Sequence, residues 1–255
     1  MGKKLSIITV SLNNIVGLKK TVESVRSQFY DNVEFIIIDG GSTDGSLDYI
    51  KEHKGMFNYW VSERDHGIYD AMNKGISHAT GEYIQFLNAG DTYYNTASLS
   101  QIFEANIQCD IVYSDYAAAG NFEKYKMPEK LSFKFFYTQS LNHQACLIRK
   151  RLFDEFEMYN IDSPIIADWE FFIKSIILFG ATTQYVPQTF ILFDFVDSMS
   201  NKQENKELIR YRRLEVLNCY FPLLMEDMKY VEAIESSRTF KIIKCISKLR
   251  SFFIK

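Results

Sequence analysis

The sequence contains little glycine and proline and no long apolar run. Its 12 glycines and 4 prolines are too few for a collagen-like, low-complexity or linker-rich chain of 255 residues. No stretch reaches the roughly 18 uninterrupted apolar residues of a membrane-spanning helix. The first residues, Met1 to Lys4, lead directly into a strand-like segment without the apolar region and cleavage site of a secretory signal, so we expect a cytoplasmic protein.

Cysteine is also scarce. No two of the four cysteines lie closer than 26 positions apart: Cys109, Cys146, Cys219 and Cys245. Zinc sites and redox dithiols need a close pair, so the spacing excludes both kinds of site. We therefore expect reduced thiols buried in the core.

The small net charge conceals a division of the chain. A formal charge of −3 argues against a dedicated nucleic-acid partner. Residues 238–255, here called the tail, carry six Lys/Arg and no acid, which leaves 23 basic against 32 acidic residues, net −9, in the other 237 positions. Helical spacing places the apolar and basic tail residues on different faces. The tail is thus either a peripheral contact with anionic lipid or a helix docked on the main domain.

Alternating strand and helix patterns in the first third predict stacked βα units around a mostly parallel sheet. The expected strands are 5–11, 33–38, 58–62 and 82–87, and the expected helices are 16–28, 46–53 and 69–78. Later segments are mixed: a helix at 98–106, strands at 111–116, 122–126 and 145–148, an aromatic loop at 133–137, and a helix after Asp168. We expect an α/β fold in residues 1–200, with halves 1–95 and 96–200, and a helical extension over 201–255.

Polar clusters follow three of these strands, after Val10, Ile38 and Leu87. In an open α/β sheet the carboxyl ends of the strands meet at one edge, where ligands bind. The first turn, 11–17, lacks the glycines of a dinucleotide site and the basic residue that a triphosphate-using nucleotidyltransferase needs, which argues against both classes. Taken singly, the acids of the second and third clusters fit ordinary turn chemistry as well as a ligand site.

Four segments together resemble a known family. Residues 7–13 (IITVSLN), 38–45 (IDGGSTDG), 65–75 (DHGIYDAMNKG) and 79–91 (ATGEYIQFLNAGD) are similar to family 2 glycosyltransferases of the GT-A fold. The resemblance is strongest to bacterial enzymes that build surface polysaccharides. It implies a Rossmann-like nucleotide-binding mixed sheet flanked by helices, and inverting transfer of a sugar from a nucleotide diphosphate sugar, most simply a UDP-sugar, to a hydroxyl of a glycan or polyprenyl-linked acceptor.

The resemblance also assigns roles to individual residues. Thr9 and Asn13 correspond to positions that line the nucleotide pocket, and Asp39 to the acid that binds uracil or ribose. The segment that borders the nucleotide and sugar includes two further positions, Asp65 and Asn73. The acid that anchors Mn²⁺ or Mg²⁺ corresponds to Asp91, and the catalytic base to Asp168.

Two departures from the family pattern leave an alternative open. Asn88 and Gly90 stand where the metal motif often has further acids, and Met72 stands where many relatives have Arg. Asp91 alone must therefore anchor the ion, with water and diphosphate oxygens completing the coordination. The thinned motif also suits a non-catalytic sugar-nucleotide-binding or scaffold protein of a polysaccharide assembly complex.

The acceptor side is less well specified. We expect the apolar neighbours of Asp168 to raise its pKa toward a value useful for a base, although the same residue could merely cap the following helix. His143 is expected near the acceptor cleft, or else in a structural role. The aromatic residues of 133–137 either stack on the acceptor or pack in the core. Ser200 falls in a segment that closes over the donor in relatives.

Overall fold

The computed structural model describes residues 2–195 and 202–237. The chain divides into two compact units, the first ending at Ile209, and each is described by itself. The expected closing segment at Ser200 and the basic tail with Cys245 lie outside the described residues.

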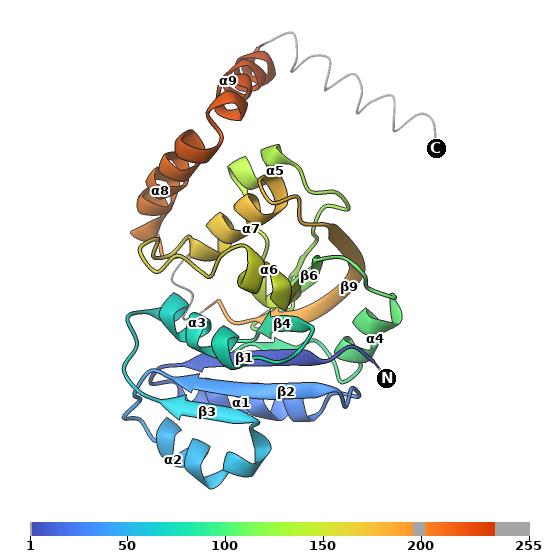
Figure 1. The fold of residues 1–255 in the computed structure, drawn as a ribbon, viewed down its shortest axis with the longest axis vertical. Coiled ribbons are helices and arrows are strands. Elements are labelled where there is room, and N and C mark those ends of the chain that lie inside the picture. The colour runs from blue at the N-terminus through green and yellow to red at the C-terminus, as the bar shows by residue number, and fades with distance from the viewer. Residues whose placement is uncertain (1, 196–201, 238–255) are drawn as a thin grey trace. The chain divides into compact units, whose positions relative to one another are not determined.

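The first unit is built on one mixed sheet of nine strands (Figure 1). Its parallel half has the order β3-β2-β1-β4: β3 (Tyr59–Ser62), β2 (Val33–Asp39), β1 (Leu5–Ser11) and β4 (Tyr83–Phe86). The order then continues β8-β6-β9-β5: β8 (Cys146–Arg149), β6 (Ile111–Ala118), β9 (Thr183–Phe193) and β5 (Thr92–Tyr93), with β7 (Lys124–Tyr125) paired to β6. This arrangement confirms the expected α/β class and places the carboxyl ends of β1, β2 and β3 at one edge.

Helices cover both faces of the parallel strands. Alternate side chains of β1 pack on α1 (Ile15–Arg26) or face α3 (Ile68–His78), where Gly75 lets the helix approach Ile8 closely. Every residue of β1 is therefore buried, and its buried polar side chains Ser6 and Thr9 form hydrogen bonds within the fold. The remaining helices of this unit are α2 (Ser46–Glu52), α4 (Ser98–Glu104), α5 (Phe133–Thr138), α6 (Lys150–Glu155) and α7 (Ala167–Ile177).

Several expectations for the second half of the sheet were wrong. The aromatic segment expected as a loop is helix α5, capped at its start by the Ser132 hydroxyl, which accepts from the Phe135 N–H. The longest strand, β9, was not predicted, because Pro187 interrupts its pattern. The register shifts of the β6–β9 pairing lie beside Pro187, since proline cannot donate to the ladder.

The described residues after 202 form two helices, α8 (Asn205–Tyr220) and α9 (Pro222–Ser236). Within the described part of the chain, no helix has both the length and the hydropathy needed to cross a bilayer. The expectation of core thiols holds for Cys146, which is buried, but Cys109 is only half-buried and Cys219 is exposed.

Candidate active site

The turns after β1 and β2 are joined to each other by hydrogen bonds. The Asn13 N–H donates to the Ser42 hydroxyl at 2.7 Å, and the Thr43 N–H donates to Asn13 Oδ1 at 2.8 Å. Asn13 adopts a left-handed backbone conformation with φ of 49°, which asparagine tolerates better than most residues. These bonds hold the two turns together at the edge of the sheet where the sequence predicts that the nucleotide binds.

Thr9 and Asp39 are both fully buried and are used inside the fold. The Thr9 hydroxyl donates to the Leu87 carbonyl at 2.7 Å and so ties β1 to the end of β4. The Asp39 carboxylate accepts from the Ser42 N–H and hydroxyl and from the Ser62 hydroxyl. In this arrangement both side chains shape the turns, and their contact with a nucleotide stays a prediction.

Helix α3 and the segment before it place Asp65 and Asn73 in different surroundings. Asp65 lies against the β2 turn, because a Cβ on Gly40 would come within 3.0 Å of Asp65 Oδ2, and Lys74 holds Asp65 Oδ1 at 2.6 Å. Asn73 faces the other half of the unit. Its amide donates to the Tyr159 carbonyl at 2.8 Å and accepts from the Tyr159 N–H at 3.0 Å. Asp65 thus lies beside the predicted nucleotide edge, whereas Asn73 holds the loop that precedes α7.

Asp91 is a buried acid with few donors. Only 3% of its surface is exposed, and one oxygen accepts from the Asp194 N–H at 2.8 Å. Burial raises the pKa of Asp91 to about 7, against the hydrogen bonds from Asp194 N–H and Gln144 and the charge of His143, which lower it. The Asp194 carboxylate raises the pKa further. The fold therefore leaves this carboxylate short of positive charge.

Asp194 was not identified from the sequence, because it directly follows β9, the strand that was not predicted. A Cβ on Gly90 would lie 3.4 Å from Asp194 Oδ2, which shows how closely this carboxylate approaches the turn after β4. Gly90 itself has φ of 110°, a conformation that a side chain would strain. The glycine that stands in place of a further motif acid therefore makes room for an acid from β9.

These groups fit a hard divalent cation. Carboxylate and amide oxygens suit Mg²⁺ and Mn²⁺, and the buried Asn88 Oδ1 has no hydrogen-bond partner. No group of three or more His, Cys, Asp or Glu among the described residues could by itself hold a metal ion. A cation at Asp91 would therefore depend on oxygens from a bound diphosphate or water.

Asp168 lies at the start of α7, in contact with two residues from other elements. Its Oδ1 accepts from the Tyr69 hydroxyl at 2.8 Å, and its Oδ2 lies 2.9 Å from His143 Nδ1. Ile166, rather than Asp168, is the N-cap of the helix. The side chains of His143 and Asp168 are only 13% and 16% exposed.

The expectation of a raised pKa for Asp168 was wrong. Burial raises the pKa of Asp168, but other contacts outweigh it. The pKa is lowered below its ordinary value by the hydrogen bonds from His143 and Tyr69, by the charge of His143 and by the Trp169 N–H. Asp168 is therefore held as a carboxylate. The apolar neighbours visible in the sequence mattered less than donors 25 and 99 positions away.

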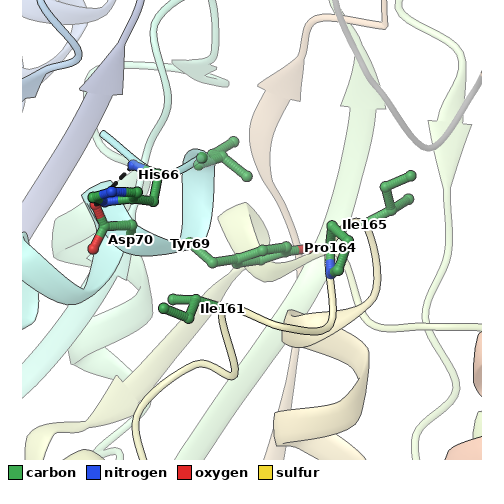
Figure 2. A pocket seen from close by; sticks show the side chains of 8 residues that line it. His66, Tyr69, Asp70, Ile161, Pro164 and Ile165 are labelled. Carbon is green, nitrogen blue, oxygen red and sulfur yellow. Dashed lines mark hydrogen bonds and ion pairs between the residues drawn. The ribbon is translucent and has the colours of Figure 1, made fainter. Parts of the chain in front are cut away.

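A cavity of about 110 Å³ adjoins this cluster (Figure 2). Figure 2 shows the ring of Tyr69 extending from α3 toward Pro164, with Ile161 beside it and the His66–Asp70 pair near the rim. Ile165 also lines the cavity, with φ of 76°, which is strained for a β-branched residue. Tyr69 thus lines the cavity and also donates a hydrogen bond to Asp168. Of the aromatic residues at 133–137, Phe136 is buried in the core.

Comparisons with known proteins agree with this architecture. Residues 6–156 match the sequence model of the family described as Glycosyl transferase family 2. An uncharacterised glycosyltransferase of Mycobacterium tuberculosis is 36% identical over 179 residues, which cover 67% of this chain and 68% of the relative. A PGL/p-HBAD biosynthesis glycosyltransferase of Mycobacterium bovis is 28% identical over 215 residues, 80% of this chain and 82% of the relative.

Two solved structures share the fold at low sequence identity. S. aureus TarS 1–349 in complex with UDP-GlcNAc has a TM-score of 0.65 and 18% identity, and the match covers 84% of this chain and 67% of that one. The mannosyltransferase PcManGT of Pyrobaculum calidifontis, in complex with GDP-Man and Mn²⁺, has a TM-score of 0.61 and 12% identity, with 95% and 83% covered. The family match and the shared fold lead to one conclusion: the chain belongs to glycosyl transferase family 2 and is a glycosyltransferase of the GT-A fold.

Proposed function

We propose that this enzyme transfers a sugar from a UDP-sugar, with inversion, to a hydroxyl of a glycan or polyprenyl-linked acceptor in bacterial surface polysaccharide synthesis. The observation that carries the proposal is Asp91, a buried acid short of positive charge at the carboxyl edge of a parallel sheet. The TarS structure with UDP-GlcNAc supports a UDP-sugar donor. The mycobacterial relative named for PGL/p-HBAD biosynthesis supports an envelope glycan product.

The donor nucleotide is proposed to lie over the joined turns of β1 and β2. Asn13, Asp39 and Asp65 border that edge, while Thr9 and Asn73 act by fixing the strand and loop around it. Asp91, with Asn88 and Asp194 beside it, would hold Mn²⁺ or Mg²⁺. A cation there supplies positive charge to the leaving diphosphate.

The acceptor is proposed to enter on the side of Asp168. The cavity beside Tyr69 gives an apolar part of the acceptor a place to bind, and the Asp168 carboxylate accepts a hydrogen bond from the hydroxyl of the same tyrosine. We propose that the Asp168 carboxylate is the base that removes the proton from the attacking hydroxyl. We place the reaction in the cytoplasm at the inner face of the membrane, where a polyprenyl-linked acceptor would be held, with the tail as a proposed membrane contact.

The test is a transfer assay with separate UDP-, GDP- and dTDP-sugars, with Mn²⁺ or with EDTA, on lipid-linked and free glycan acceptors. We expect nucleotide release with UDP-sugars and Mn²⁺ only, and NMR of the product should show an anomeric configuration opposite to that of the donor. Turnover of GDP-sugars alone would overturn the choice of donor. Tight UDP binding whose affinity does not depend on Mn²⁺, without turnover of any donor, would favour the non-catalytic scaffold.

A further inference from the structure

The cavity beside Tyr69 is lined by isoleucine, proline, glycine and the tyrosine ring, with His66 and Asp70 at its rim (Figure 2). The two rim residues are bonded to each other, since the His66 N–H donates to Asp70 Oδ2 at 3.0 Å. Ile68 and Ile161 expose 37% and 49% of their surface, although isoleucine is usually buried. The cavity therefore presents aliphatic side chains to a ligand.

Ile165 has a backbone conformation that isoleucine avoids. Its φ of 76° lies in the left-handed region, where a branched side chain is crowded against the backbone. Asparagine or glycine would adopt this conformation at a lower cost, and strain of this kind is concentrated at functional sites. Because Ile165 lines the cavity, its strain is accounted for if an apolar side chain at this position contributes to binding.

The wall formed by residues 160–165 is held at both ends by helix α3. Before the wall, the Asn73 side chain bonds both the carbonyl and the N–H of Tyr159, at 2.8 and 3.0 Å. After it, the Tyr69 hydroxyl donates to Asp168 at 2.8 Å. The cavity is thus formed before a ligand arrives, which favours selective binding.

The cavity lies close to the proposed base. The ring of Tyr69 lines the cavity, and the hydroxyl of the same side chain contacts Asp168. A hexose ring is about as wide as a tyrosine ring. A group in the cavity therefore belongs to the sugar whose hydroxyl faces Asp168, and a lipid carrier attached through a diphosphate would lie further away.

The charge around the cavity also disfavours a diphosphate. Residues 63–74 carry three acids and two bases, and Asp162 in the wall adds a further acid. The hydrogen bond from the His66 N–H lowers the pKa of Asp70, so this rim residue is a carboxylate. Lys74 is already paired with acids of its own segment. Negative surroundings repel a diphosphate, which leaves an uncharged apolar group as the occupant.

We infer that the cavity selects a 6-deoxyhexose as the acceptor sugar, with its C6 methyl group against Ile161 and Ile165 and one of its hydroxyls facing Asp168. An acceptor role for the cavity rests on the proposed function. In a hexose of the same configuration, C6 carries a hydroxyl that would exchange water for isoleucine side chains. An N-acetyl group fits less well, since its amide N–H and carbonyl would both need partners.

Acceptor pairs that differ in one hydroxyl test the inference. The probes are the methyl glycosides of L-rhamnose and L-mannose, of L-fucose and L-galactose, and of 6-deoxy-D-glucose and D-glucose, assayed with the donor found in the transfer assay. We expect kcat/KM to be 10- to 100-fold higher for the 6-deoxy member of the pair that is used, the usual discrimination of an apolar pocket against an added hydroxyl. Equal values within every pair that is used, or a preference for N-acetylated sugars, would overturn the inference.

Ile165→Asn is the decisive variant, because asparagine tolerates the left-handed φ and makes the wall polar. We expect an equal or higher melting temperature, unchanged UDP affinity and a preference within the pair of less than threefold. Ile165→Val keeps the wall apolar and should keep the preference. Phe122→Asn is the matched control, because Phe122 also has a positive φ, 58°, at an exposed position between β6 and β7. A changed donor preference in Ile165→Asn, with the acceptor preference intact, would overturn the inference by assigning the cavity to the donor.

Binding is measured without turnover by saturation-transfer NMR of the methyl 6-deoxyglycosides in the presence of UDP and Mn²⁺. We expect the strongest saturation at the C6 methyl protons and its loss in Ile165→Asn. Uniform saturation over the sugar ring, or no binding of any 6-deoxyglycoside, would overturn the inference. Binding through the methyl group, without sugar transfer by the unmodified protein, would contradict the proposed function alone.

Discussion

Two buried acids lie at opposite edges of the same parallel strands, and the fold treats them differently. Glu34, at the amino-terminal edge, accepts from the hydroxyls of Ser6 and Thr80, from the Thr80 N–H and from Lys4. Burial opposes ionisation there, but these donors hold the pKa of Glu34 at about 2. For Asp91, at the carboxyl-terminal edge, burial prevails and the pKa is about 7.

The difference is what we expect between a carboxylate that serves the fold and one that, as we propose for Asp91, binds a cation. A buried charge is stabilising only when donors replace the water it has lost. Glu34 has those donors within the chain, so its removal should harm folding. Asp91 has only the Asp194 N–H and Gln144 as donors, too few to offset burial, so a cation or another positive partner is needed to stabilise its charge. Both acids are buried, so burial does not distinguish them, whereas the number of hydrogen-bond donors that each carboxylate has does.

The sharpest test of this comparison is Asp91→Asn. We expect transfer activity to fall by roughly 10³-fold, because the amide holds a hard cation far less well than a carboxylate. Stability without metal should stay the same or rise, since the variant removes a buried charge. Activity assays and thermal unfolding in EDTA measure both effects, with the exposed Asp31→Asn as the matched control. A strongly destabilised Asp91→Asn would place Asp91 with Glu34 as a structural acid.

The two acids should also give opposite pH dependence. The pKa of Asp91 is higher in the folded chain than in the unfolded one, so its contribution to stability falls as pH rises from about 4 to about 7. The pKa of Glu34 is lower when folded, so its contribution is complete above about pH 4.5 and lost toward pH 2.

Urea unfolding in EDTA at pH 5 and pH 8 measures the first effect. We expect a difference of up to a few kcal/mol that Asp91→Asn reduces and Glu34→Gln leaves unchanged. If the free energy of unfolding changed equally between pH 5 and pH 8 in the unmodified protein and in Asp91→Asn, Asp91 would not be the group responsible.

The Glu34→Gln substitution should destabilise the fold by about 2 kcal/mol or more, because it leaves several donors facing an amide. That loss corresponds to a melting temperature lower by roughly 4–8 °C. Activity per folded molecule should not change. Glu104→Gln makes the same chemical change at an exposed position and should leave both quantities unaltered. Loss of specific activity in Glu34→Gln without loss of stability would break the comparison.

A smaller effect is expected from Tyr69→Phe. The variant removes one hydrogen-bond donor from Asp168 but keeps the aromatic ring that lines the cavity. We therefore expect kcat to fall by about 3- to 10-fold. Tyr185→Phe is the matched control, because Tyr185 donates to Asp115 at the same distance, 2.8 Å, away from the site. We expect the control to alter stability alone, and equal activity in the two variants would argue against a role for the Tyr69 hydroxyl.

The sequence predicted the parallel half of the sheet well, for a physical reason. The buried strands are rich in Ile, Val and Phe, as in the run Phe35–Ile38, and the glycine-rich turn after Asp39 and the Asn88–Gly90 turn before Asp91 mark where two of them end. Strand β9 escaped prediction because Pro187 and a partly exposed face disturb its pattern. The missing strand concealed Asp194, and so half of the acidic pair at the predicted metal position.

The acceptor side shows a second limit. Asp168 and His143 were identified as candidates, but their contact depends on how α7 packs beside the turn before β8, which no local pattern encodes. The pKa of Asp168 was misjudged for the same reason, since the neighbours in sequence are apolar while the neighbours in space are donors. Long-range side-chain pairs of this kind become visible only with the tertiary structure.

Helix α3 has a consequence for engineering. Lys74 near its end holds Asp65 against the nucleotide edge, while Tyr69 and Asn73 hold Asp168 and the loop at Tyr159. This one helix of 11 residues therefore contributes to both the proposed donor site and the proposed acceptor site. A chimera that exchanges the second half of the unit from residue 96 onward would separate Asp168 from Tyr69 of this helix, which donates to it. Grafts intended to change the acceptor should transfer 65–78 together with the second half.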